Sequence, residues 1–179
     1  MGKATRLGGV LIRDATAEDW PAIWPFFRRI VAAGDTYTLP VDLPEADARA
    51  MWMLSPPERT VVAVEDGGAG DGAGGVVVGS AKMGPNHRGP ASHIATASFM
   101  VAPEHQGRGV GRALGEEVVR WATAEGYRAI QFNAVVEANR PAVALWTSLG
   151  WEIVGTLPEG FRHPTEGYVG LHIMLRRLP

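Results

Sequence analysis

The sequence contains no cysteine, no long apolar run and no strong excess of charge. Without cysteine there can be no disulfide, thiolate metal site or cysteine nucleophile. No uninterrupted apolar stretch approaches the roughly 20 residues that a membrane-spanning helix needs. The net charge of −2 gives no reason to expect nucleic acid or an anionic membrane as a partner. Because the first six residues are polar and lack the apolar core of a secretory signal, we expect a cytoplasmic protein.

The length of 179 residues and the hydrophobic content of 46% fit one compact domain, which we place at residues 1–179. Hydrophobic periodicity predicts the order βααβββαβαββ. The expected strands are 9–13, 60–64, 76–83, 93–101, 129–136, 151–156 and 168–175. The expected helices are one capped by Thr16 and kinked or delayed by Pro25, followed by 44–54, 109–125 and 141–149. Segment 33–43 is expected to be a loop, and the Gly-rich segment 66–75 a hairpin tip.

Residues 101–114 hold the most informative motif, V-A-P-E-H-Q-G-R-G-V-G-R-A-L, in which a strand runs through a loop into a helix. Free N–H groups and the dipole at a helix N-terminus favour an anion. Glycines let a pyrophosphate approach the backbone, and arginines add charged hydrogen bonds. The residues expected to hold it are Gln106, Gly107, Arg108, Gly109, Val110, Gly111 and Arg112.

Two other nucleotide motifs can be tested against this loop. A dinucleotide fingerprint, G-x-G-x-x-G/A, fails because Arg112 or Leu114 stands at the last place, and no G-K-[ST] exists for a phosphate-binding P-loop. The alternative to a phosphate-binding loop is a glycine-rich turn that only caps the helix. Downstream, Asn139 opens a short predicted helix that Gly150 and Trp151 close.

These two motifs resemble those of the GCN5-related N-acetyltransferases, whose loop pattern is Q/R-x-x-G-x-G/A. The resemblance implies an α/β (α+β) fold, with one domain and a mostly antiparallel, splayed sheet flanked by helices. It also implies acetyl-CoA as the cofactor. The backbone of Phe99, Met100 and Val101 would contact the pantetheine arm, as would the side chain of Asn139. The acetyl group would lie in the gap between the strands that carry Phe99 and Asn133.

The sequence departs from the family at its usual acid and base. Trp146 occupies the place of a tyrosine that protonates the leaving thiolate, and we expect it beside the cofactor. An indole N–H is no useful acid. Ala134 occupies the place of a glutamate base and cannot take a proton. A non-catalytic acyl-CoA-binding sensor or scaffold is therefore the alternative to an enzyme.

A narrower resemblance is to the yeast acetyltransferases that act on the proline analogue azetidine-2-carboxylate. It rests on segments 34–40 and 83–101 together with Phe132, Asn133 and Asn139. It implies that Asn133 polarises the thioester, and that Thr96 stands where another asparagine would assist. The alternatives are a buried structural role for Asn133 and an ordinary strand position for Thr96. Tyr37 either lines the acceptor pocket or packs in the core.

The expected reaction is direct transfer of the acetyl group to the amine of a small molecule, such as an amino acid or its analogue. The amine must first lose a proton, since an amine with a pKa of about 10 is protonated at neutral pH. The histidines His93, His105, His163 and His172 show no metal-ligand spacing, so no metal is expected. A homodimer is an expectation from the family alone.

Overall fold

The computed structural model describes residues 4–7, 9–65 and 75–179. The predicted hairpin tip at 66–75 lies outside these residues except for Gly75. The described strands form one sheet in the order β1-β2-β3-β4-β5-β6-β8-β7. They are β1 (Thr5–Leu7), β2 (Val10–Asp14), β3 (Arg59–Glu65), β4 (Val76–Pro85), β5 (Ile94–Val101), β6 (Ala129–Val136), β7 (Glu152–His163) and β8 (Gly167–Arg177).

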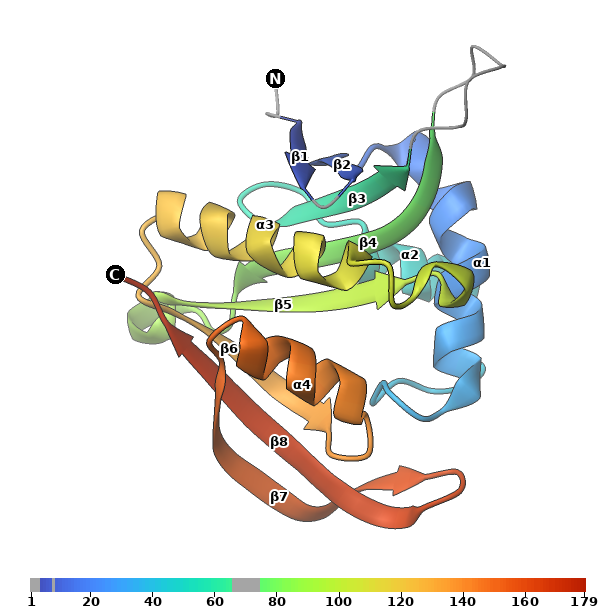
Figure 1. The fold of residues 1–179 in the computed structure, drawn as a ribbon, viewed down its shortest axis with the longest axis vertical. Helices are drawn as coiled ribbons and strands as arrows, with labels where there is room; N and C mark the ends of the chain where they lie inside the picture. Colours follow the sequence, from blue (N-terminus) through green and yellow to red (C-terminus); the bar gives the residue numbers. More distant parts are fainter. Residues whose placement is uncertain (1–3, 8, 66–74) are drawn as a thin grey trace.

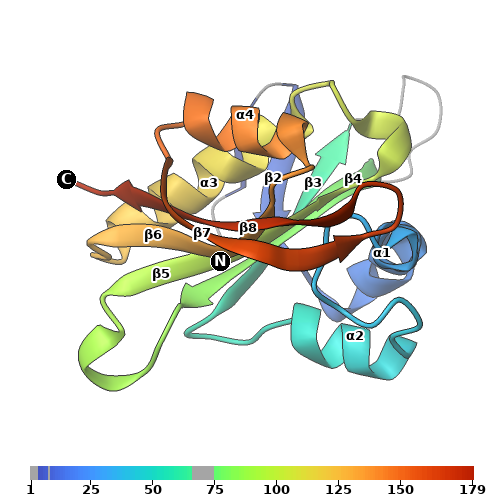
Figure 2. The ribbon, with the colours of Figure 1, turned by 90° about the horizontal axis from the view of Figure 1, so that it is seen from below.

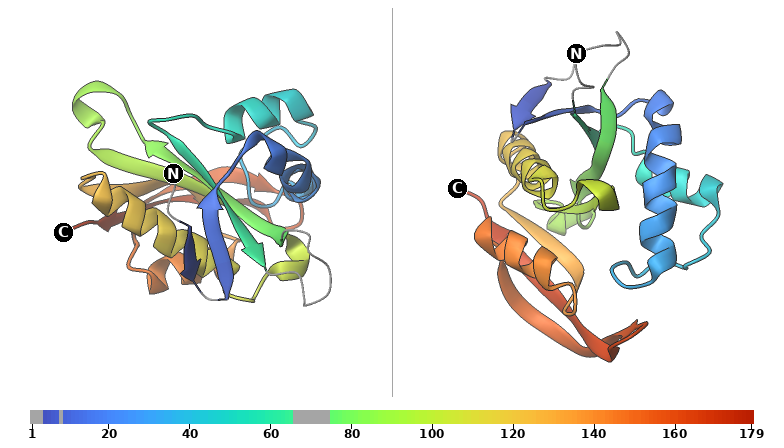
Figure 3. Two further views of the ribbon diagram at one scale, coloured as in Figure 1. Left: turned by 90° about the horizontal axis from the view of Figure 1, so that it is seen from above. Right: turned by 45° about the vertical axis from the view of Figure 1, so that its right-hand side comes forward.

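Helices cover both faces of this sheet, and Figure 2 shows α3 and α4 on one side with α1 and α2 on the other. Their bounds are α1 (Trp20–Ala33), α2 (Glu45–Trp52), α3 (Val110–Ala124) and α4 (Arg140–Ser148). The predicted order of elements is confirmed, and the short strand β1 precedes it. The two further views in Figure 3 show the same layering of helices around the sheet.

The first helix begins where its apolar stripe begins. Thr16 and Asp19 form the expected capping box, in which the Thr16 N–H donates to Asp19 Oδ2 at 2.7 Å. A 3-10 turn, Ala17–Asp19, leads directly into α1 at Trp20. The prediction of a late start at Pro25 was wrong: Pro25 lies inside the helix. Burial of the apolar face outweighs the hydrogen bond that proline removes.

Each face of the sheet has its own apolar core. On one face Trp20, Phe27 and Trp52 of α1 and α2 pack against the sheet. On the other face Leu114 and Trp146 of α3 and α4 do so. Strand residues therefore alternate between an α1–α2 face and an α3–α4 face, and this alternation decides which side chains can meet.

The sheet is antiparallel except between β5 and β6, which run parallel. In the described chain these two strands pair only at Ile94 with Ala129 and at Ala95 with Ile130. Beyond these pairs they diverge, as Figure 1 shows. The expected splay is confirmed, and it leaves one edge of β5 open after Ala95.

A buried charge network fixes α3 over the first strands. Glu117 of α3 is 4% exposed and accepts a hydrogen bond from Arg59 Nη1 at 2.7 Å. Arg59 also bonds Asp14 of β2 at 2.5 Å, and Arg120 forms a second ion pair with Glu117. A buried carboxylate needs such partners, since an unpaired charge would be costly. The network holds the helix whose first turn carries the glycine loop.

Candidate functional site

The glycine loop enters α3 with an open backbone. Gly107 and Gly109 have φ angles of 74° and 86°, and no atom lies within 4 Å of a Cβ built on either. Gly109 is the N-cap and provides no side-chain cap. The first helical bond runs from Ala113 N to Gly109 O, at 3.0 Å. The N–H groups of the first turn therefore have no partner within the helix, which fits an anion such as a pyrophosphate.

The polar side chains of the loop surround this helix end. Gln106, Arg108 and Arg112 are exposed. Arg112 donates to Ser148 Oγ of α4 at 2.7 Å. The two helices pack closely, since a Cβ at Gly111 would lie 3.2 Å from Leu145 Cδ2. The loop is thus held at a fixed position relative to α4.

The open edge of β5 offers backbone groups at alternate residues. The Ile94 carbonyl accepts from Asn86 N on the β4 side, and Ala102 N donates to Val78 O on that side. By alternation Phe99 and Val101 direct their N–H and C=O groups toward β6, where pairing has ended. Met100 was predicted with them, but its backbone faces β4 and its side chain is 1% exposed. The structure corrects that prediction: of the three residues, Phe99 and Val101 direct their backbone groups toward the open edge and Met100 does not.

Tyr37 lies in the segment between α1 and α2 and reaches this edge. Its hydroxyl donates to the Phe99 carbonyl at 2.6 Å, and its ring packs against the α1–α2 core. Burial raises the pKa of Tyr37, against the smaller lowering by the Phe99 hydrogen bond. The phenol therefore stays protonated at neutral pH and acts as a donor. Tyr37, which the sequence suggested for the acceptor pocket, thus links the segment between α1 and α2 to strand β5.

Replacing Tyr37 by phenylalanine should lower the free energy of unfolding by about 1 kcal/mol, because it removes this hydrogen bond and little packing. A raised folded-state pKa means that stability present below the ordinary tyrosine pKa of about 10 is lost as pH rises above it. The Tyr37→Phe variant should therefore lose less stability than the wild type as the pH rises above about 10. Urea unfolding at neutral and alkaline pH measures both effects. Tyr168→Phe, at a side chain 67% exposed, is the control, and equal behaviour of the two variants would contradict the assignment.

Asn139 opens α4 as predicted. Its Oδ1 accepts from Ala142 N at 3.3 Å, which caps the helix, while its Nδ2 group is a separate donor. Trp146 lies further along α4 and is 7% exposed. Its ring centroid is 4.5 Å from that of Phe99 and 5.1 Å from that of Phe132. Trp146 therefore fills the wedge between β5 and β6 beneath α4, beside the open edge.

Asn133 sits at an irregularity in β6. Phe132 pairs with Met174 and Val135 with His172, so Asn133 and Ala134 together oppose Ile173. Such bulges redirect side chains and occur beside active sites. Asn133 is exposed, so the alternative of a buried structural residue is wrong.

The Asn133 amide joins β6 to the end of β4. Its Nδ2 donates to Asn86 Oδ1 at 2.7 Å, and Asn86 Nδ2 donates back at 3.3 Å. Gln131 Nε2 donates to Asn133 Oδ1 at 2.7 Å. Sequence reasoning missed Asn86 and Gln131 as partners, although alternation had placed Gln131 and Asn133 on one face. The three amides bridge the gap that opens between β5 and β6.

Thr96 lies on the same side of the sheet as this amide cluster. Its neighbours Ala95 and Ala97 belong to the α3–α4 core, so Thr96 faces the α1–α2 side. The same reasoning places Ser98 and its cross-strand partner Lys82 there. These residues form a polar floor beside the open edge of β5. Thr96 is half-buried within it, next to the point where β5 leaves β6.

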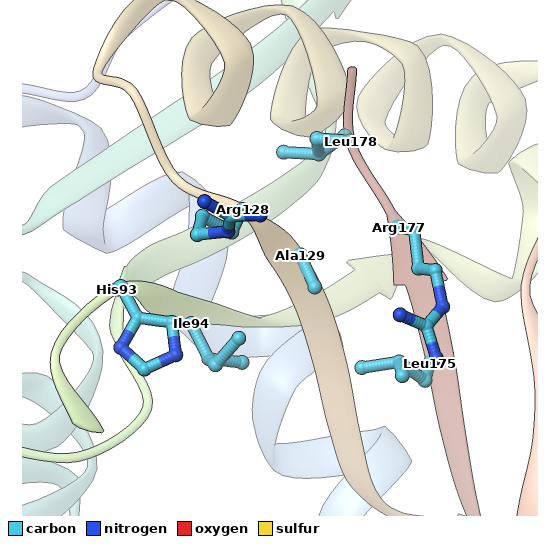
Figure 4. A pocket seen from close by; sticks show the side chains of 7 residues that line it. All are labelled: His93, Ile94, Arg128, Ala129, Leu175, Arg177 and Leu178. Carbon is cyan, nitrogen blue, oxygen red and sulfur yellow. The ribbon is translucent and has the colours of Figure 1, made fainter.

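A pocket lies away from these residues. A pocket of about 280 Å³ lies at the start of β5 and β6, at the end of β5 away from the glycine loop. Figure 4 shows its seven lining residues: His93, Ile94, Arg128, Ala129, Leu175, Arg177 and Leu178. It contains none of the site residues predicted from the sequence. The candidate site is therefore defined by the arrangement of backbone donors at the loop and the β5 edge.

Within residues 4–7, 9–65 and 75–179, no group of three or more histidine, aspartate or glutamate side chains is placed to hold a metal ion. In the same part of the chain, no helix has the length and apolar character needed to cross a membrane.

Comparison with known proteins agrees with this geometry. The family model described as "Acetyltransferase (GNAT) family" matches residues 18–151. A GCN5-related N-acetyltransferase structure from Kribbella flavida shares 55% identity and a TM-score of 0.88, covering 95% of this chain and 98% of that one. A phosphinothricin acetyltransferase from Sinorhizobium meliloti, solved in complex with AcCoA, shares 26% identity and a TM-score of 0.80 over 95% and 89% of the two chains.

Two curated relatives add sequence evidence. The N-acetyltransferase aca1 of Schizosaccharomyces pombe is 31% identical over 104 residues, 58% of this chain and 50% of that protein. The chain thus spans about half the length of this yeast relative. The L-methionine sulfoximine/L-methionine sulfone acetyltransferase of Pseudomonas aeruginosa is 28% identical over 152 residues, 83% of each chain. The expected likeness to a yeast N-acetyltransferase is confirmed.

Proposed function

The chain belongs to the acetyltransferase (GNAT) family, and we propose that its acceptor is the amine of a small molecule of the amino-acid class. We infer that it is an acetyl-CoA-dependent enzyme, which the Sinorhizobium meliloti acetyltransferase solved in complex with AcCoA supports. The observation that supports an acetyltransferase role most strongly is the combined site: an open helix N-terminus at Gly109 and an edge of β5 that has no strand partner after Ala95. The amino-acid class of acceptor rests on the Pseudomonas relatives that act on methionine analogues.

The residues present fit acetyl-CoA part by part. The loop from Gln106 to Arg112 would hold the pyrophosphate through its backbone N–H groups, and the space around Gly107 and Gly109 is open to it. The Phe99 N–H, the Val101 backbone and the Asn139 amide would hold the pantetheine arm, which would lie along β5 like an added strand; the Phe99 carbonyl already accepts from Tyr37. When bound, the cofactor supplies an acetyl thioester. Trp146 shields that region from water because it fills the wedge between β5 and β6.

On the other side of the splayed strands, the amide cluster would orient the acceptor. Asn133 has two N–H donors, and one is used by Asn86. We propose that the second donates to the carbonyl oxygen under attack, which gains negative charge in the transition state. Thr96, beside it on β5, would assist with its hydroxyl. Holding both reactants in this geometry makes the transfer effectively intramolecular.

Coenzyme A should raise the melting temperature, because a ligand that binds only the native state stabilises it. At a hundred times Kd the gain is about 2.7 kcal/mol, or roughly 5–10 °C for a domain of this size. A thermal scan with CoA, acetyl-CoA and, as the control, pantetheine without the nucleotide measures it. A folded protein that shows no shift with millimolar CoA would contradict the assigned site.

A turnover assay distinguishes an enzyme from the alternative, a non-catalytic acyl-CoA sensor. Thiol release from acetyl-CoA is followed with L-methionine sulfone, L-methionine sulfoximine, azetidine-2-carboxylate, common amino acids, polyamines and a short peptide. We expect turnover with members of the amino-acid group. A CoA-dependent thermal shift without turnover on any amine would support the sensor instead. The cytoplasmic location and the homodimer stay predictions.

A further inference from the structure

A carboxylate lies across the polar floor at a place that the sequence pattern did not indicate. Glu58 comes directly before β3, and its side chain covers Gly84 of β4. A Cβ built on Gly84 would lie 2.8 Å from Glu58 Cγ and 3.5 Å from Glu58 Oε1. A side chain at position 84 would therefore collide with Glu58. Because Gly84 has no side chain, the Glu58 side chain can lie over β4.

Strand alternation places Glu58 on the acceptor side of the sheet. Arg59 points to the α3–α4 face, where it bonds Glu117, so Glu58 and Thr60 point to the other face. Thr60 confirms this, since its hydroxyl donates to the Trp52 carbonyl of α2 at 2.7 Å. The β5 partner of Gly84 is Thr96. Glu58, Gly84 and Thr96 thus form one row across the floor, ending where β5 leaves β6.

Two titratable groups lie within electrostatic reach of the Glu58 carboxylate: Lys82 on the floor, and Tyr127, which packs against Trp121 of the α3–α4 core. Lys82, two residues before Gly84, donates from Nζ to the Met51 carbonyl at 2.9 Å. Burial lowers the pKa of Lys82, while the attraction of Glu58 opposes that lowering. Burial raises the pKa of Tyr127, and the charges of Glu125 and Glu58 raise it further. Glu58 itself is exposed, so an acceptor can reach it and a proton can leave it to water.

We propose that Glu58 is a catalytic residue that binds the acceptor's ammonium group and takes its proton. This rests on the proposed function and supplies what the sequence lacks, since Ala134 and Trp146 occupy the usual positions of base and acid. One proton passes from the ammonium to the Glu58 carboxylate and then to water. The freed amine forms a C–N bond to the acetyl carbon as the C–S bond breaks. The thiolate takes the second proton lost by the nitrogen, which leaves an amide and CoA.

The test compares Glu58→Gln and Glu58→Asp with the wild type, using the panel amine with the highest wild-type kcat/KM. At neutral pH, Glu58→Gln should lower kcat/KM for the amine by roughly 10²–10³-fold, the usual loss for a general base. The loss should shrink by about tenfold per pH unit as pH rises toward the amine's pKa, where free amine is abundant. Glu58→Asp should recover part of the rate. The thermal shift with CoA should match the wild type.

Glu152→Gln is the matched control, at an exposed glutamate on β7, and should behave as the wild type. An unchanged rate for Glu58→Gln would overturn the proposal. So would a loss of equal size at every pH, because a structural effect would not follow the ionisation of the amine. Wild-type protein that binds CoA but acetylates no panel amine would overturn the proposed function itself, a result distinct from both.

Discussion

Replacing Gly109 by glutamate is expected to abolish CoA binding while the protein stays folded. The new carboxylate would stand at the N-cap of α3, among the N–H groups assigned to the pyrophosphate. Two like charges about 4 Å apart at a protein surface repel by roughly 4 kcal/mol, which is about a thousandfold in Kd. Calorimetry with CoA measures the affinity. Because surface repulsion is screened by salt, part of the loss should be recovered at high ionic strength.

The same helix provides the control. Gly126 follows α3 at its other end, with a φ angle of 79° and no atom within 4 Å of a built Cβ. Gly126→Glu therefore carries the same left-handed strain and the same added charge without touching the loop. The left-handed strain should cost each variant roughly 1–2 kcal/mol of stability, and Gly126→Glu should lose more, because its carboxylate lies at the negative end of the helix dipole. Near-native CoA affinity in Gly109→Glu would show that the loop only caps the helix.

Much of the site was accessible from local sequence signals. The glycine loop, the Asn139 cap and the alternation in β5 and β6 depend on neighbours within a few residues, so periodicity and spacing predict them. The short strand β1 was missed because three residues are too few to show a period. The strands β7 and β8 extend beyond the predicted 151–156 and 168–175, because long-range pairing between them sustains positions with weak intrinsic preference.

What the sequence could not show is which side chains meet across strands. The Asn86–Asn133 pair joins residues 47 positions apart. Glu58 reaches the floor only because β3 pairs with β4 in a register that places Gly84 beside it. Met100 was misassigned because a motif names three consecutive residues, whereas a strand edge presents the backbone of alternate residues. The register between two strands depends on the whole sheet, so it cannot be predicted from the sequence of one segment.

In the proposed mechanism, the splay between β5 and β6 would bring cofactor binding and chemistry to one place. Pairing stops after Ala95 and Ile130, so the β5 backbone beyond it needs new partners. The same divergence admits Trp146 from the α3–α4 side and exposes Thr96 and Asn133 on the α1–α2 side. The cofactor's thioester and the acceptor amine can therefore approach the gap from opposite faces. Asn133, which spans the gap through Asn86, is then the side chain best placed to act on the reacting carbonyl.

Asn133→Ala should reduce kcat by roughly 10²-fold, the loss expected when one oxyanion donor is removed. The CoA affinity should change little, since this donor acts mainly in the transition state. Trp146→Phe is the contrast. It should keep kcat within about tenfold, because the indole is not an acid in this mechanism, but should lose roughly 1–3 kcal/mol of stability at a site only 7% exposed. Steady-state kinetics and urea unfolding of both variants measure these effects.

The Asn86→Ala variant tests whether Asn133 needs its hydrogen-bond partner in order to act as a donor. Without Asn86 the Asn133 amide loses the partner at 2.7 Å that fixes its direction, yet keeps both N–H groups. We expect a smaller fall in kcat than for Asn133→Ala, of roughly tenfold, and no further loss in the double variant beyond that of Asn133→Ala, since the two residues act as one unit. A near-normal kcat for Asn133→Ala together with an inactive Trp146→Phe would show that the mechanism is wrong. The shape of Trp146 in the wedge, rather than a donor from β6, would then be what the transfer requires.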